Sequence, residues 1–161
     1  MGIDPGYAIV GVGLVDYDNV RFSLVEYGAI TTPAELPFET RLRQIYDDMV
    51  GLITQYRPDA VAMEQLFFTT NRTTAIAVAE ARGVLLLAAE QQGVPVFNYT
   101  PLQVKSAVVG YGKAEKEQVM EMTRRLLCLR EVPKPDDTAD ALAIAICQCH
   151  ASGTALRQFL R

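Results

Sequence analysis

The sequence predicts an α/β domain in which a mixed sheet is covered by helices on both faces. Three observations carry this prediction. Three strand-like segments come first, and helices and strands alternate after them. The chain has 161 residues, 50% of them hydrophobic, so it can bury a core of its own. No internal repeat or linker interrupts it, and we therefore expect a single domain over residues 1–161.

The first three strands are predicted from short apolar or alternating segments. Gly2-Ile3-Asp4 is a short apolar start, and residues 8–16 are β-branched and contain glycine. Residues 20–30 alternate apolar and polar side chains, and turn residues occupy 16–19 between the two longer strands. These two segments therefore predict an antiparallel hairpin that follows the first strand.

The rest of the chain alternates between strands and amphipathic helices. Residues 60–64 form a short apolar run, residues 66–72 are expected to be a loop, and residues 95–99 predict a fifth strand. Apolar residues at helical spacing and helix-ending glycines or prolines predict five helices. They cover about 37–56, 73–92, 101–109, 113–127 and about 136–150.

The predicted helix over residues 73–92 is apolar on more than one face. Small residues surround Gly83 in its centre. Such a helix must be covered on both sides, either by its own domain or by a second subunit. We expect a homodimer.

Four acidic side chains stand at ends of predicted elements that meet at one edge of the sheet. Asp4 follows the first strand, Glu64 ends the apolar run, and Asp137 and Asp140 lie one turn apart where the last helix begins. Carboxylate oxygens are the ligands that Mg²⁺ prefers, and Mn²⁺ accepts the same donors. Two such ions, about 3.5–4 Å apart, suit displacement at a phosphodiester. The pattern therefore predicts a metal-dependent nuclease.

Each acid also has a simpler explanation when it is considered alone. Glu64 could be an exposed acid at a strand end, and Asp136, Asp137 and Asp140 could be helix-start acids favoured by the helix dipole. The coincidence of all four at cleft-side termini favours the metal site.

The charge distribution allows a nucleic-acid partner although the net charge is −4. Residues 1–62 hold nine acids and four bases, which gives −5, whereas residues 101–130 hold six bases and three acids, which gives +3. A local basic face can collect phosphates on an acidic molecule. The alternative is a solvated helical surface.

Other compositional signals exclude rival chemistries. Cys147, Cys149 and His150 are neighbours on one predicted helix and do not converge on a metal, so we expect reduced thiols. His150 is the only histidine, which argues against Ser-His-Asp or Cys-His catalysis. The apolar stretches are shorter than the roughly 20 residues of a membrane span, and we expect a soluble, cytoplasmic protein.

Seven motifs, in order along nearly the whole chain, resemble the RuvC family of Holliday junction resolvases. They are Gly2-Ile3-Asp4-Pro5-Gly6, Glu64-Gln65-Leu66-Phe67, Ala81-Arg82-Gly83-Val84, Gln103-Val104-Lys105, Val108-Val109-Gly110, Ala114-Glu115-Lys116 and Asp137-Thr138-Ala139-Asp140-Ala141-Leu142-Ala143. The resemblance implies an RNase H-like fold with a mixed five-stranded sheet. It also implies a dimeric, Mg²⁺-dependent endonuclease that nicks two strands of like polarity in four-way junction DNA. A RuvAB-type branch-migration complex is an expected partner.

The resemblance also assigns roles to individual residues. Asp4, Glu64, Asp137 and Asp140 match the metal-binding, catalytic acids of the family. Phe67 matches an aromatic that acts on bases at the junction centre, and Lys105 and Lys116 match basic residues near the cleaved backbone. Arg72 and Lys113 complete the expected DNA-contacting set.

Two departures from the family pattern bear on these assignments. Family members usually carry a few apolar residues before the Gly-Ile-Asp segment, and some have histidine at the position of Asp137. The alternatives are another RNase H-like nuclease, a junction-binding protein without catalysis if Asp4 is misplaced, and a small nucleotide-binding ATPase. An actin-like ATPase would need a second lobe, for which this chain has no room.

Overall fold

The computed structural model describes residues 1–66 and 72–159, with only the backbone for residues 72, 73 and 154–159. Its sheet is mixed and five-stranded, as predicted, in the order β3-β2-β1-β4-β5. The pairs β1–β2 and β2–β3 are antiparallel, and β1–β4 and β4–β5 are parallel. The strands are β1 (Gly2–Asp4), β2 (Ile9–Tyr17), β3 (Phe22–Thr31), β4 (Val61–Glu64) and β5 (Val96–Tyr99).

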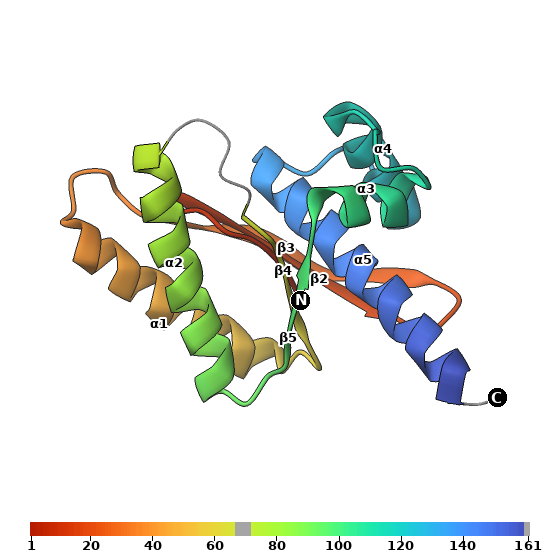
Figure 1. The fold of residues 1–161 in the computed structure, drawn as a ribbon, viewed down its shortest axis with the longest axis horizontal. Helices are drawn as coiled ribbons and strands as arrows, with labels where there is room; N and C mark the ends of the chain where they lie inside the picture. The colour runs from red at the N-terminus through yellow and green to blue at the C-terminus, as the bar shows by residue number, and fades with distance from the viewer. Residues whose placement is uncertain (67–71, 160–161) are drawn as a thin grey trace.

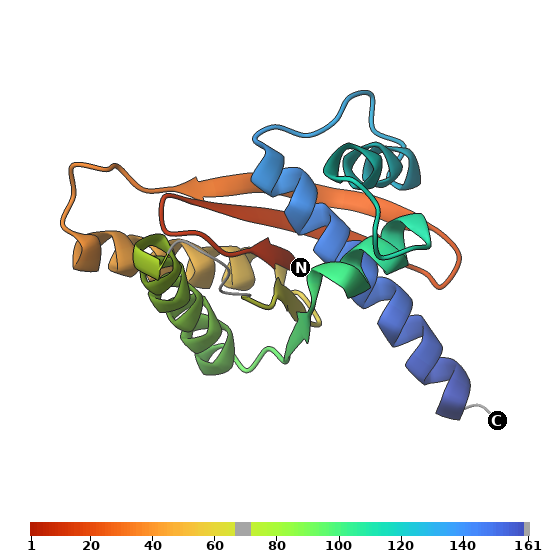
Figure 2. The same cartoon turned by 45° about the horizontal axis from the view of Figure 1, so that its top comes forward.

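Helices cover both faces of this sheet, which confirms the predicted architecture (Figure 1). Two pack on one face and the other three gather on the opposite face (Figure 2). The first pair is α1 (Phe38–Tyr56) and α2 (Arg72–Gln91), and the second group is α3 (Pro101–Val109), α4 (Lys116–Leu126) and α5 (Asp136–Phe159). None of the described helices is both long and apolar enough to span a bilayer.

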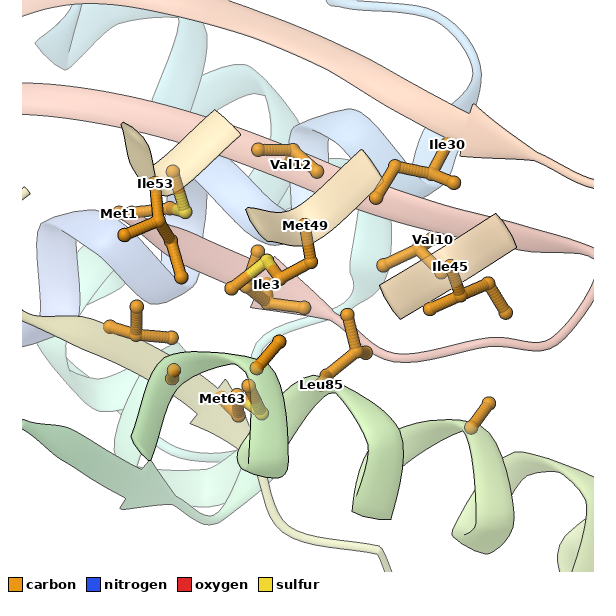
Figure 3. Close-up of a cluster of buried hydrophobic side chains, with 14 of the residues drawn as sticks. Met1, Ile3, Val10, Val12, Ile30, Ile45, Met49, Ile53, Met63 and Leu85 are labelled. Atoms are coloured by element: carbon orange, nitrogen blue, oxygen red, sulfur yellow. The ribbon is translucent and has the colours of Figure 1, made fainter. Parts of the chain in front are cut away.

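The larger core lies between the sheet and the helices α1 and α2 (Figure 3). Ile3 of β1 and Met63 of β4 point into it and are fully buried, together with Ile45, Met49 and Leu85 from the two helices. Fully burying such a side chain contributes about 1.5–3 kcal/mol. Packing against α1 and α2 therefore holds the central strands β1 and β4 in place on the sheet face opposite to α5.

Two helix boundaries differ from the predicted ones. Helix α4 begins at Lys116 rather than at residue 113, because Glu115 and Gln118 form a capping box that fixes its start. Helix α5 runs to Phe159 rather than ending near His150. Gly153 costs such a helix only about 1 kcal/mol, no proline follows it, and the Tyr17 ring lies against it.

Candidate functional site

Asp4 and Glu64 lie next to each other at the carboxyl ends of two parallel strands. The register pairs Gly2 with Ala62 and Ile3 with Met63, so the next position aligns the two acids. Side chains alternate along a strand, so Asp4 shares a face with Gly2, which lies against α5. Ala62 belongs to the core beside α5, and Glu64 shares its face. Both carboxylates therefore lie on the α5 side of the sheet.

Three glycines allow α5 to approach this face closely. A Cβ on Gly11 would lie 2.0 Å from the carbonyl oxygen of Asp137, and one on Gly2 would lie 2.1 Å from that of Ala141. Gly13 likewise leaves no room for a Cβ beside Leu142. Gly11 is the cross-strand partner of Asp4. Because these glycines have no Cβ, the first turn of α5 can pack directly on the sheet beside that acid.

The first turn of α5 is anchored by Thr138. This side chain is fully buried, and both its backbone N–H and its hydroxyl donate to the carbonyl oxygen of Pro135. Ala139 is buried beside it, whereas Asp137 and Asp140 are only partly buried. The helix start is thereby fixed with its two acids near β1.

The electrostatics show that the four carboxylates share one region. Burial, followed by repulsion from Asp140, Glu64 and Asp137, raises the pKa of Asp4 to about 8. Burial and then Asp140 also raise the pKa of Glu64, against the opposing effect of Lys105 and Lys116. The sheet and α5 thus bring together acids that lie far apart in the sequence.

In metal-free buffer, we expect the free energy of unfolding to fall as the pH rises from about 4 to about 8. The folded protein holds a proton on Asp4 up to about pH 8, whereas its ordinary pKa of 3.8 applies in the unfolded chain. The resulting stabilisation is full below pH 3.8 and is lost as the pH passes about 8. Urea denaturation in EDTA across this range measures the fall, and Asp4→Asn should remove much of it. An equally steep fall in that variant would contradict this origin.

Two lysines border the acidic cluster. The ammonium of Lys116 lies 2.9 Å from Asp140 and 3.8 Å from Asp136, and Lys105 lines the same cavity of about 240 Å³ as Glu64 and Asp140. Desolvation lowers the pKa of Lys116, but its hydrogen bond and attraction to Asp140 outweigh that effect and leave it raised. The cavity thus pairs acidic and basic groups, as a phosphate-processing site requires.

The remaining predicted residues are not all placed. Lys113 is exposed in the segment before α4. Asp136, expected to be only a helix-start acid, pairs with Lys134 at 2.8 Å. Phe67 lies outside the described residues, and Arg72 begins α2 with a side chain that is also outside them.

The donor set fits a divalent cation by its chemistry. All four groups are carboxylates, and Asp4 has no ion pair among the described residues while three other acids repel its charge. Within the same part of the chain, no three acidic, histidine or cysteine side chains form a ready-made coordination group. Asp140 is engaged by Lys116 instead.

One polar contact that supports the site, made by Arg82, was not predicted from the sequence. Arg82 of α2 donates from Nε to the carbonyl oxygen of Glu64 at 3.3 Å and from a terminal nitrogen to the Asn98 side chain of β5. Arg82 therefore ties α2 to the ends of β4 and β5. The motif Ala81-Arg82-Gly83 was visible in the sequence, but no spacing rule links it to residue 64.

Comparisons with known proteins give a consistent result. Residues 1–148 match the family model described as crossover junction endodeoxyribonuclease RuvC. The protein of that name from Brevibacillus brevis is 59% identical over 146 residues, covering 91% of this chain and 88% of the relative. The one from Clostridioides difficile is 53% identical over 152 residues, covering 94% and 90%.

Solved structures agree with the sequence relatives. The structure of T. thermophilus RuvC in complex with Holliday junction substrate matches with a TM-score of 0.91 and 37% identity, covering 96% of this chain and 94% of that chain. The yeast mitochondrial Holliday junction resolvase Ydc2 matches with a TM-score of 0.65 over 98% of this chain and 82% of its own. Its 14% identity supports the shared fold alone.

Proposed function

The chain belongs to the RuvC family of crossover junction endodeoxyribonucleases, and from that membership we propose that it resolves Holliday junctions by paired cuts in the DNA backbone. The family defines a hydrolase that acts on DNA. The observation that supports the reaction here is the alignment of Asp4 with Glu64 under the acids of α5. We also propose that residues 1–161 form one nuclease domain and that the enzyme acts in the cytoplasm.

The four acids would hold two Mg²⁺ ions, or Mn²⁺ in their place, which would supply an activated water and charge neutralisation at the leaving 3′ oxygen. Asp4 is central in this assignment because the other three carboxylates all act on its pKa. Lys105 and Lys116 offset the repulsion between these acids and an approaching phosphate. Hydrolysis would leave a 5′ phosphate and a 3′ hydroxyl. Phe67 and Arg72 remain proposed DNA contacts.

The first strand is well seated for this role. The strand β1 is paired on both sides, antiparallel with β2 and parallel with β4, and Ile3 at its centre is fully buried. This pairing argues against the alternative of a junction-binding protein with a misplaced Asp4.

Comparing three substrates tests the function. A mobile four-way junction, a linear duplex and an RNA–DNA hybrid are incubated with the enzyme, with and without Mg²⁺. We expect Mg²⁺-dependent cutting of the junction and little cutting of the other two. Preferred cutting of the hybrid would favour another RNase H-like nuclease, and junction binding without nicking in any metal would favour a non-catalytic protein. Adding a RuvAB-type complex tests the proposed branch-migration partner.

The outer face of α2 supports a homodimer. Ile76 and Leu87 are 62% and 51% exposed, and Gly83 between them has open space where a Cβ would stand. These three positions share one helical stripe. A second copy packed on this stripe would hold two active sites at a fixed separation that suits a two-fold symmetric junction.

We expect Leu87→Glu to yield a monomer whose junction cleavage falls at least about tenfold, because a charge would be buried without a partner in the interface. Light scattering after gel filtration gives the mass, and a junction assay gives the rate. Val20→Glu is the matched control, since Val20 is 81% exposed and lies between β2 and β3 rather than on α2. A dimeric, fully active Leu87→Glu protein would refute the α2 interface.

A further inference from the structure

A groove runs between β3 and α1 on the sheet face opposite to the four acids. It encloses about 560 Å³, with Val12 and Leu14 of β2 as its floor. Gly28 of β3 and Gly51 of α1 line it, and a Cβ built on either would have no atom within 4 Å. The space is therefore open because two facing elements each lack a side chain there. Figure 2 shows β3 as the outer strand with α1 beneath the same part of the sheet.

The outer edge of β3 offers backbone hydrogen-bonding groups along this groove. In the described part of the chain β3 pairs only with β2. The N–H of Tyr27 donates to its neighbour Glu26 at 3.0 Å, and Gln44 of α1 donates to the carbonyl oxygen of Thr31 at 3.1 Å. Both groups point away from β2, and the alternation of an antiparallel strand directs the N–H and C=O of Ala29 the same way.

The acidic side chains around the groove indicate that its partner carries positive charge. Glu26, Asp47 and Asp48 line it and are exposed. Asp47 has one exposed ion pair, with Arg43 at 3.5 Å, and no described cation pairs with the other two. Such a surface repels nucleic acid and attracts basic side chains.

We propose that the β3–α1 groove binds an extended, Lys- or Arg-rich segment of a partner protein, which adds to β3 as a further strand. Backbone bonds at Ala29, and at Tyr27 and Thr31 once the exposed Glu26 and Gln44 side chains are displaced from them, would give affinity, and the acids would select basic side chains at alternate positions. The groove lies on the sheet face opposite to Asp4, so it is separate from the acidic site. This inference does not depend on the nuclease proposal.

The test uses a displayed library of random peptides of about seven residues, a strand's length, selected on the full chain. Gly51→Leu serves as the blocked variant, because the new side chain fills open space and leucine favours a helix. We expect the enriched peptides to be basic and to bind Gly51→Leu at least about tenfold more weakly than wild type. The amide of Ala29 should become protected from exchange in the complex. Junction cleavage by Gly51→Leu should equal that of wild type.

Charge variants complete the test. Asp48→Lys should also weaken binding of the selected peptides, whereas Glu35→Lys, the same change on an exposed acid outside the groove, should not. Melting temperatures confirm that each variant folds. Peptides that bind wild type, Gly51→Leu and Asp48→Lys equally would overturn the proposal, as would a selection that enriches no groove-dependent sequence.

Discussion

Asp4→Asn should lower the rate of junction cleavage by about 10³-fold or more while junction binding is retained. Asp4 is the acid on which all three other carboxylates act, so its loss removes a carboxylate ligand from the centre of the proposed metal site. An amide keeps the size of the side chain, and the fold should survive. Single-turnover cleavage and gel-shift binding on the same junction separate the two effects.

The same substitution should change how metal affects stability. Mg²⁺ binding to the folded state raises the melting temperature of wild type, and this increase should shrink in Asp4→Asn. Asp136→Asn is the matched control, because that acid is half-exposed and is held by Lys134 at 2.8 Å, with only a longer contact of 3.8 Å to Lys116. Cleavage by Asp4→Asn within about tenfold of wild type, or an equal loss in the control, would refute the central role of Asp4.

Gly11→Ala should destabilise the fold by about 2–3 kcal/mol and slow cleavage by about 10²-fold. The new Cβ would stand 2.0 Å from the carbonyl oxygen of Asp137, so the start of α5 must move away from the sheet. Asp137 and Asp140 would then shift relative to Asp4. Urea denaturation gives the free energy of unfolding, and the junction assay gives the rate.

Gly28→Ala is the control for this experiment. It makes the same change on the neighbouring strand of the sheet, where a Cβ meets nothing within 4 Å. We expect its stability and cleavage to match those of wild type. Wild-type behaviour of Gly11→Ala would show that α5 does not depend on that close approach.

The sheet and its acidic edge were predictable because local patterns and one topological rule suffice for them. Alternation predicted the hairpin of β2 and β3, and Asp4 and Glu64 ended short apolar runs. Since parallel strands direct their carboxyl ends to the same edge, these two acids could be expected to meet there. Asp137 and Asp140 followed from helical spacing at the start of α5.

The supporting contacts could not be predicted, because each depends on packing between distant segments. Gly11 and Gly13 alternate along one face of β2, which is a signal for close approach, but nothing local indicates that α5 is the element that approaches. The contact of Arg82 with Glu64 joins two residues that lie 18 positions apart in the sequence. The extension of α5 beyond His150 brings Gly153 beside the Tyr17 ring of β2, a contact that no local pattern indicates.

The order in which these elements leave the ribosome has a consequence for the cell. Asp4 and Glu64 lie on the early strands β1 and β4, but the acids of α5 are synthesised after residue 135. Until α5 has been synthesised and has packed against the glycines of β1 and β2, a nascent chain holds only two of the four acids, Asp4 and Glu64. A chain that stops before residue 136 would therefore lack Asp137 and Asp140 and should not cleave a junction.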